Sequence, residues 1–246
     1  MLRQSTRSLA YFGAVLLVLA ASWMANSCSA ATIIGDPVKL STLAGNPQGQ
    51  VVVGDKKFTQ FGYTFTGEMP DAAGVNVVPI LDDLGNYGIR FQGFFTDLAS
   101  SQGGSDVTIT YKVEVTDPRR VITDAHLQGN PTLGNGTQGR HGLAQVVETF
   151  LPIGELGEYT MVISDDEALP TPVLTAWTYF NPPVKMLSVQ KDIGVLAVAG
   201  NPSPSISFID QTYSQNIPEP ATVALAVIGM IALSGHMRRH DSKYRA

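Results

Sequence analysis

The sequence predicts an all-β domain, an antiparallel β-sandwich or jelly-roll-like fold, in the middle of the chain. Apolar and polar residues alternate there at a period of two, as in half-buried antiparallel strands. Gly, Pro, Asn and Asp separate these runs, as turn residues do. No long amphipathic helix is expected between Ala31 and Asn216. Many short strands at this spacing are typical of a sandwich or jelly roll.

The clearest predicted strand is Asp106–Thr116, where Val107, Ile109 and Tyr111 alternate with polar residues. We place the domain at residues 31–209 and interpret residues 210–217 as a short polar spacer. Phe61–Phe65, Ile89–Phe95 and Tyr159–Ile163 alternate similarly, and other strands are expected at Gln50–Val53, Val75–Ile80, Val121–Leu127, Gln145–Leu151, Val173–Phe180, Val184–Gln190, Ile193–Val198 and Ser205–Ile209.

Residues 1–30 have the pattern of a secretory signal peptide that flanks the domain with an N-terminal helix. Arg3 and Arg7 precede the apolar stretch Leu9–Ala21, and small residues follow. This pattern predicts export through the Sec translocon and cleavage by signal peptidase between Ala30 and Ala31. An uncleaved anchor helix and a lipoprotein modified at Cys28 remain alternatives.

Residues 218–240 form a second processing segment. Pro218, Glu219 and Pro220 precede a 15-residue apolar stretch, residues 221–235, and Arg238 and Arg239 follow it. The stretch predicts a C-terminal transmembrane helix, but it is shorter than the roughly 20 residues of a lasting span. The arginines would stay on the cytoplasmic side. We therefore expect a transient span, with an ordinary anchor helix as the alternative.

The triplet, the helix and the arginines together resemble the PEP-CTERM sorting signal of Gram-negative bacteria. The resemblance covers Ile217–Arg239, and residues 241–246 extend past the point where the family often ends. It implies recognition by an exosortase, a membrane-embedded transpeptidase, and removal of the tail near Pro218, Glu219 and Pro220. The protein would then be membrane-associated as a precursor and reach the cell surface or the extracellular space after processing.

Charge and cysteine content exclude several classes of function. The chain has a net charge of −5, and residues 31–217 carry 10 Lys and Arg against 19 Asp and Glu, which gives −9. This acidic body is unsuited to nucleic acid, which requires a basic surface. Cys28, the one cysteine, precedes the predicted cleavage point, so neither a disulfide framework nor thiol chemistry is expected in the mature domain.

No motif in the domain predicts a catalytic residue, a metal site or a cofactor. Residues 134–139 match G-x-G-x-x-G, but the βαβ context of a dinucleotide site is missing. His126 and His141 lack metal-ligand spacing. The acidic groups Asp82–Asp83 and Asp165–Glu167 are interpreted as solvated turns, with Ca²⁺ binding as the alternative.

The expected function is non-enzymatic, that of an exported cell-surface or matrix protein. The main alternative is a carbohydrate-binding module that acts on exopolysaccharide, with or without Ca²⁺. It rests on Trp177, Tyr179 and Phe180, because strand alternation puts the first two on one face and Phe180 on the other. A secreted hydrolase is a third alternative and would require two carboxylates facing each other across a cleft.

Overall fold

The computed structural model describes residues 31–98, 103–136, 139–152, 158–199 and 201–216. The predicted signal peptide and sorting tail lie outside this range, with Ala30, Pro218, Glu219, Pro220, Arg238 and Arg239. Ala31 begins the described part of the chain and is buried. No helix within that part is long and apolar enough to cross a membrane.

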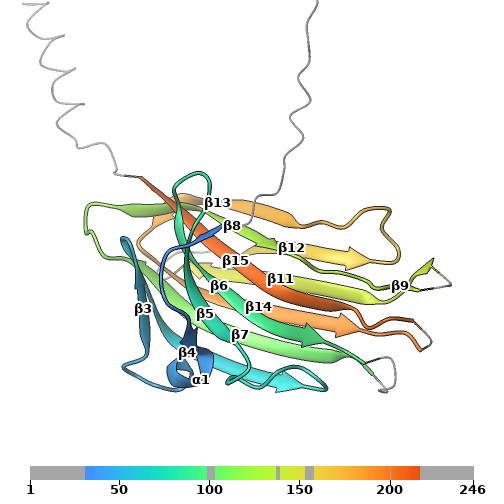
Figure 1. Ribbon diagram of the computed structural model, residues 1–246. Helices are drawn as coiled ribbons and strands as arrows, with labels where there is room; N and C mark the ends of the chain where they lie inside the picture. The colour runs from blue at the N-terminus through green and yellow to red at the C-terminus, as the bar shows by residue number, and fades with distance from the viewer. Residues whose placement is uncertain (1–30, 99–102, 137–138, 153–157, 200, 217–246) are drawn as a thin grey trace, which may run out of the picture.

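The larger of two main sheets has seven strands in the order β1-β5-β6-β15-β8-β13, with β2 also paired to β5 (Figure 1). All of its pairs are antiparallel. Its strands are β1 (Thr32–Ile33), β2 (Val38–Lys39), β5 (Asn76–Leu81), β6 (Tyr87–Thr96), β8 (Val121–Gly129), β13 (Thr175–Val184) and β15 (Ser205–Asn216).

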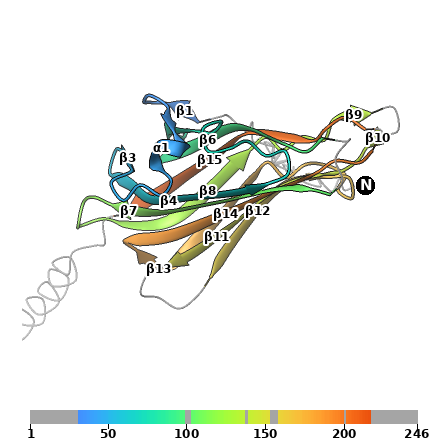
Figure 2. The ribbon, with the colours of Figure 1, turned by 90° about the horizontal axis from the view of Figure 1, so that it is seen from below.

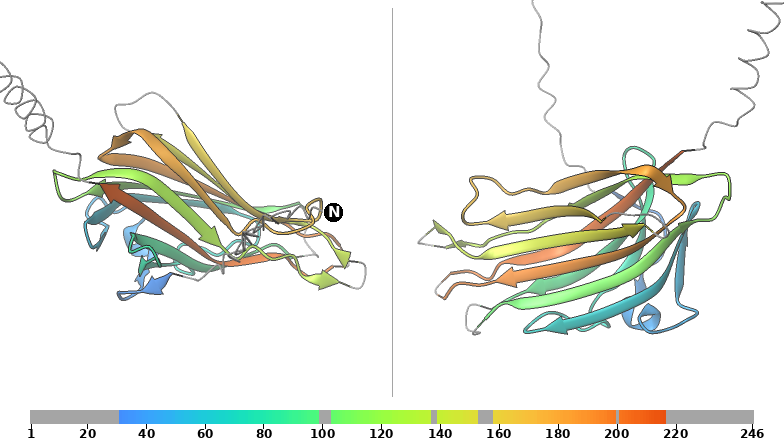
Figure 3. Two further views of the ribbon diagram at one scale, coloured as in Figure 1. Left: turned by 90° about the horizontal axis from the view of Figure 1, so that it is seen from above. Right: turned by 180° about the vertical axis from the view of Figure 1, so that it is seen from behind.

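The second sheet has six strands in the order β12-β11-β14-β7-β4-β3, also antiparallel throughout. The two sheets form separate layers, and the view from behind shows the six-stranded sheet in front (Figures 2 and 3). This confirms the predicted antiparallel β-sandwich. The strands are β3 (Gln50–Val53), β4 (Lys56–Thr66), β7 (Ser105–Val115), β11 (Leu143–Pro152), β12 (Tyr159–Asp166) and β14 (Met186–Leu196); β9 (Asn135–Gly136), β10 (Gly139–Arg140) and the short helix α1 (Leu40–Leu43) complete the described elements.

The core lies between the two sheets and is rich in aromatic rings. The β7 residues Val107, Ile109, Tyr111 and Val113 are buried, as their alternation predicts. Tyr111 meets Phe91 from the opposite sheet, with ring centroids 5.7 Å apart. The inward faces of both sheets therefore supply one continuous hydrophobic core.

The prediction of a polar spacer at residues 210–217 is wrong for residues 210–216. These residues form the second half of β15, between β6 and β8 in the seven-stranded sheet. Asp210, Gln211, Thr212 and Tyr213 are buried in spite of their polar groups. Their partners come from strands and turns far away in the sequence, as with the Arg90 guanidinium, which donates to both Asp210 oxygens at 2.6 and 2.7 Å.

Two boundaries near the C-terminal end of the domain also differ from the prediction. Most of the two expected strands Val184–Gln190 and Ile193–Val198 belongs to one continuous strand, β14. Lys191, which lies between them, is buried in the core and pairs there with Glu148. Residues 181–183, which separate the expected strands Val173–Phe180 and Val184–Gln190, lie inside β13, where the Asn181–Pro182 peptide is cis and the register shifts between Tyr179 and Val184.

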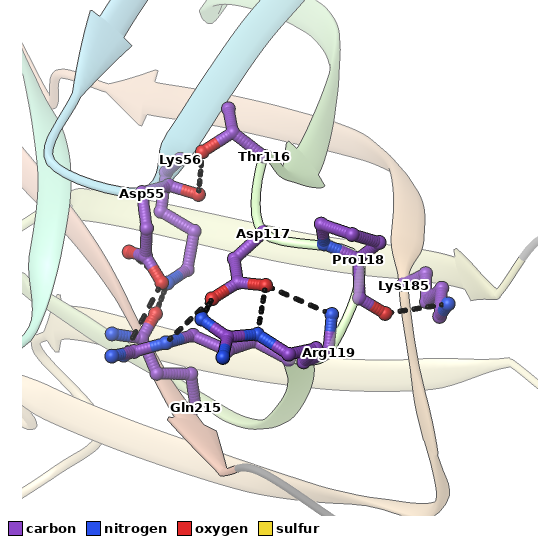
Figure 4. A network of polar contacts seen from close by, with 9 residues as sticks. Asp55, Lys56, Thr116, Asp117, Pro118, Arg119, Lys185 and Gln215 are labelled. Carbon is purple, nitrogen blue, oxygen red and sulfur yellow. Dashed lines mark hydrogen bonds and ion pairs between the residues drawn. The ribbon is translucent and has the colours of Figure 1, made fainter.

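A polar network holds the end of β15 against the opposite sheet (Figure 4). Lys56, at the start of β4, is buried, and its Nζ donates to Asp55 Oδ1 at 2.9 Å and to the side chain of Gln215. Asp55 also pairs with Arg120, 3.6 Å away. Burial lowers the pKa of Lys56, and the hydrogen bond to Asp55 opposes that shift.

Candidate functional site

Two exposed aromatic rings stand on the outer face of the seven-stranded sheet, on its edge strand β13. Trp177 and Tyr179 are 62% and 63% exposed, and their ring centroids are 5.1 Å apart. Phe180 points the other way and packs edge-on against Phe150 in the core, at 5.4 Å. The structure therefore confirms the predicted division of these three aromatic residues between the two faces of one strand.

The register of the sheet places polar side chains beside this aromatic pair. His126 of β8 lies opposite Trp177, and Thr212 of β15 lies opposite His126. Tyr179, Asp124 and Ser214 form the next row in the same way. Directly paired residues share a face of a sheet, so both rows lie on the outer side. We call His126, Asp124, Ser214 and Thr212 the polar strip.

Hydrogen bonds connect the polar strip. His126 Nε2 is 2.8 Å from Asp124 Oδ1 and 3.4 Å from Ser214 Oγ. Thr212 Oγ1 donates to Asp82 Oδ2 at 2.7 Å. The second ring nitrogen of His126 makes no hydrogen bond to the described part of the chain, and about a third of this side chain is exposed. The imidazole can therefore bond to a ligand and stay fixed by Asp124.

The pair His126–Asp124 is electrostatically coupled. The hydrogen bond to Asp124 raises the pKa of His126 above its ordinary value, although burial opposes this. Burial would raise the pKa of Asp124, but hydrogen bonds from His126 and Ser214 outweigh that effect and lower it. An ionised Asp124 thus faces a histidine that holds its proton to higher pH than usual.

Serine, histidine and aspartate lie together here without forming a hydrolytic relay. In such a relay the imidazole uses one nitrogen for the serine and the other for the carboxylate. Both contacts of His126 use Nε2. The arrangement therefore cannot pass a proton from Ser214 through the ring to Asp124. It presents fixed donors and acceptors beside two rings, which suits a ligand with an apolar face and several hydroxyl groups.

A second polar area lies on the outer face of the six-stranded sheet, and the sequence analysis did not single it out. Thr64, Thr66, Asp106, Thr108 and Asp192 line a hollow of ≈ 410 Å³. Burial and the neighbouring Asp192 raise the pKa of Asp106. The two carboxylates stand on the adjacent strands β7 and β14 of one sheet face, rather than on opposite walls of a cleft.

Asp82 and Asp165, one residue from each acidic group considered for Ca²⁺, accept hydrogen bonds within the fold. Asp82 Oδ1 accepts from the backbone N–H groups of Leu84 and Asn86, at 2.9 and 2.8 Å. Asp165 Oδ2 accepts from the N–H of Leu133 at 2.8 Å. Across the described ranges, no group of three or more His, Cys, Asp or Glu side chains is placed to hold a metal ion.

The structural neighbours that comparison with known proteins gives are distant, as two of them illustrate. No protein-family model matches the chain, and no curated protein matches it. One solved structure, the carbohydrate-binding module TmCBM61 in complex with β-1,4-galactotriose, is 13% identical at a TM-score of 0.30 and covers 62% of this chain and 88% of its own. Endoglucanase 3 of Trichoderma harzianum, from family GH12, is 12% identical at a TM-score of 0.20 and covers 65% of this chain and 97% of its own. These scores are too low for either likeness to bear on what this chain binds.

Proposed function

We propose that this chain is an exported β-sandwich protein that binds glycan chains on the outer face of its seven-stranded sheet. The observation that carries the proposal is the exposed pair Trp177 and Tyr179 beside the polar strip. Large exposed apolar groups that gather on one face mark interaction sites more often than isolated ones do. Tryptophan and tyrosine are also the residues that most often anchor ligands.

The chemistry of the two rows fits a sugar chain. The apolar C–H face of a pyranose ring can lie on Trp177 or Tyr179, and the hydroxyl groups at its rim can reach Asp124, His126 and Ser214. Sugars stacked on Trp177 and Tyr179 would follow the direction of β13, so a polysaccharide could continue past the end of this strand. The platform therefore suits an extended chain better than a free monosaccharide.

Charge favours a neutral glycan. The domain segment carries −9, and both Asp82 and Asp124 belong to the site or adjoin it. An acidic polysaccharide would be repelled at low ionic strength, and salt would screen that repulsion. We therefore assign the site to neutral polysaccharide, with the exopolysaccharide of the producing cell as the first ligand to test.

Affinity electrophoresis of the purified protein in gels that contain single polysaccharides tests this function. Neutral chains should retard the protein, acidic ones should not, and a chelator should leave the retardation unchanged. Loss of binding on chelation would favour the Ca²⁺-dependent alternative. Unchanged mobility in every gel, including one made with the producing cell's own exopolysaccharide, would overturn the proposal.

We also propose that residues 218–240 direct the sorting of the protein through an exosortase. The support is the arrangement of Pro218, Glu219 and Pro220 before a short apolar stretch that Arg238 and Arg239 close. Replacing all three triplet residues by alanine should leave an uncleaved precursor in the membrane fraction. Asp241→Asn, beyond the basic cluster, is the control and should be processed normally. A triple variant that is processed like the parent would show the tail assignment to be wrong.

A further inference from the structure

Three reactive side chains meet in the core, away from the proposed glycan site. Lys191 of β14 lies opposite Glu148 of β11, and its Nζ is 2.7 Å from Glu148 Oε1. The same Nζ donates to the side-chain oxygen Oε1 of Gln211 at 2.8 Å. Gln211 belongs to β15, so the lysine of the six-stranded sheet reaches across the core to an amide of the seven-stranded sheet. All three residues are 0% exposed.

The surroundings of this trio are apolar and aromatic. The phenol groups of Tyr111 and Tyr213 lie 2.9 Å apart, and both interact electrostatically with Glu148. Phe150 and Phe58 pack on the Tyr213 ring at 6.4 and 6.1 Å. Charges are unfavourable in such a place, and a buried amine and a buried carboxyl group tend to become neutral instead.

The protonation equilibria of the pair follow that expectation. Burial lowers the pKa of Lys191, although Glu148 and Asp210 oppose the shift. Burial raises the pKa of Glu148, although Lys191 and Tyr111 oppose it. Both shifts favour the neutral amine, which is a nucleophile, and the neutral carboxylic acid, which is a proton donor.

We propose that Lys191 and Gln211 form an intramolecular amide cross-link, and that Glu148 transfers the protons. The lone pair of Lys191 Nζ attacks Gln211 Cδ and forms the new C–N bond, while the carbonyl π electrons move to Oε1. One Glu148 oxygen takes a proton from Nζ, and the carboxyl group gives its own proton to Gln211 Nε2. The tetrahedral intermediate then expels ammonia, so an amine and a primary amide become a secondary amide plus NH₃.

Two contacts of Lys191 support this step. The hydrogen bond from Nζ places the amine 2.8 Å from the oxygen of the carbonyl group whose carbon it would attack. Glu148 touches the reacting nitrogen, and it ends the reaction as it began, with its proton. Gln211 Nε2, the leaving group, makes no hydrogen bond within the described part of the chain, so its release breaks no contact there, and Glu148 has to turn toward it to deliver the proton. All three side chains are 0% exposed, so bulk water, the competing nucleophile, does not reach them.

The cross-link would join the two layers of the sandwich. Lys191 and Gln211 are 20 residues apart in the chain and lie on different sheets. A covalent bond between them would restrict the unfolded chain and resist separation of the sheets, as a disulfide does. Such a bond suits an exported protein whose mature domain is expected to lack cysteine.

The chain contains a comparable contact that serves as an internal control. Lys56 also contacts a glutamine of β15, Gln215, and its acidic neighbour is Asp55 (Figure 4). Asp55 is partly exposed and also pairs with Arg120. Its carboxylate thus lies at the edge of the domain between two cations, and not in an enclosed apolar core as Glu148 does. We therefore expect one cross-link and not two.

The test is the intact mass of the purified, denatured full chain, followed by peptide mapping. Loss of one ammonia should place the parent about 17 Da below the mass calculated for its observed termini. Trypsin should fail to cut after Lys191, and fragmentation should give no ions from backbone breaks between Lys191 and Gln211. Lys191→Met and Glu148→Gln should both restore the calculated mass, whereas Lys56→Met should keep the loss.

Gln211→Glu gives a second, independent readout. Its reaction would release water instead of ammonia, so the loss should change to about 18 Da. A parent at its calculated mass would overturn the proposal, whatever the variants do. So would a loss that persists in Lys191→Met, or a loss of about 18 Da in the parent that maps to Lys191 and Glu148. None of these outcomes depends on glycan binding.

Discussion

Trp177 of β13 lies directly opposite His126 of β8, so an exposed indole and a half-buried imidazole share the outer face of one sheet. The two residues are 51 positions apart in the sequence. The pairing gives the aromatic platform a polar border whose orientation Asp124 fixes. Stacking and hydrogen bonding to one sugar ring are therefore possible at this place.

Removing the indole should abolish most glycan binding and leave the fold intact. We expect Trp177→Ala to weaken binding about tenfold or more, the usual effect of losing an aromatic anchor. The midpoint of thermal unfolding should stay the same, because the side chain is 62% exposed. Titration calorimetry with the polysaccharide selected by gel retardation measures the first effect. Phe94→Ala, an aromatic residue of similar exposure on β6, is the matched control and should bind like the parent.

The ion pair His126–Asp124 should make stability depend on pH. The folded-state pKa of His126 is raised above 6.5, so its contribution is fully present below that value and is lost as pH rises through the raised pKa. His126→Gln should therefore be less stable than the parent at pH 6 and approach it at pH 9. For a partly exposed pair, the difference should be under about 1 kcal/mol. Urea unfolding measures it, and an NMR titration in which His126 titrates below 6.5 would contradict the assignment.

A lone Glu148 should destabilise the core more than an apolar replacement of the whole pair. Lys191→Met leaves a buried carboxyl group without its polar partner, whereas Lys191→Met/Glu148→Leu removes both ionisable groups. Neither variant can form a cross-link, so their difference reports on the carboxyl group alone. We expect the double variant to be more stable by about 3 kcal/mol at pH 8.

The same difference should shrink as pH falls. Burial raises the pKa of Glu148 above 4.5, and removing Lys191 takes away a charge that opposes the rise. The folded single variant thus keeps a proton that the unfolded chain gives up, so its stability falls as pH rises above that value. Urea unfolding at pH 5 and pH 8 checks this. A difference that is constant between the two would mean that Glu148 is not buried as the structure shows.

The end of the domain should lie at Asn216 and not at Ile209. A chain cut after Ile209 loses Asp210, Gln211, Thr212 and Tyr213, and with them half of a central strand. We expect this chain, started at Ala31, to show no cooperative unfolding. A chain from Ala31 to Asn216 should unfold in one transition with native near-ultraviolet circular dichroism. Cooperative unfolding of the shorter chain would contradict the role of β15.

Alternation along single strands was sufficient to predict much of the fold. The pattern at Asp106–Thr116 matches β7 within one residue at each end, and Gln50–Val53 matches β3. It also placed Trp177 and Tyr179 on one face and Phe180 on the other. These predictions succeed because the two-residue period of a strand is a local property of the chain. Alternation did not predict the strands at Lys191 and at residues 210–216, because polar side chains face the interior there.

The sequence predicted only part of the proposed glycan site. The aromatic pair is local to β13, but the polar strip comes from β8 and β15, and the register between strands decides which of their residues adjoin it. The acidic pair Asp106 and Asp192 is also a product of register, because the two residues lie on neighbouring strands and far apart in the chain.

The sequence by itself determined those features that depend only on the order of residues along the chain. That includes a pattern typical of a signal peptide, a tail that resembles a sorting signal, the acidic charge and the all-β class. Only the tertiary structure decided which polar groups are buried and what they touch. The physical reason is that burying Lys191, Glu148 or Asp210 is tolerable only next to a partner, and each of those partners comes from another strand.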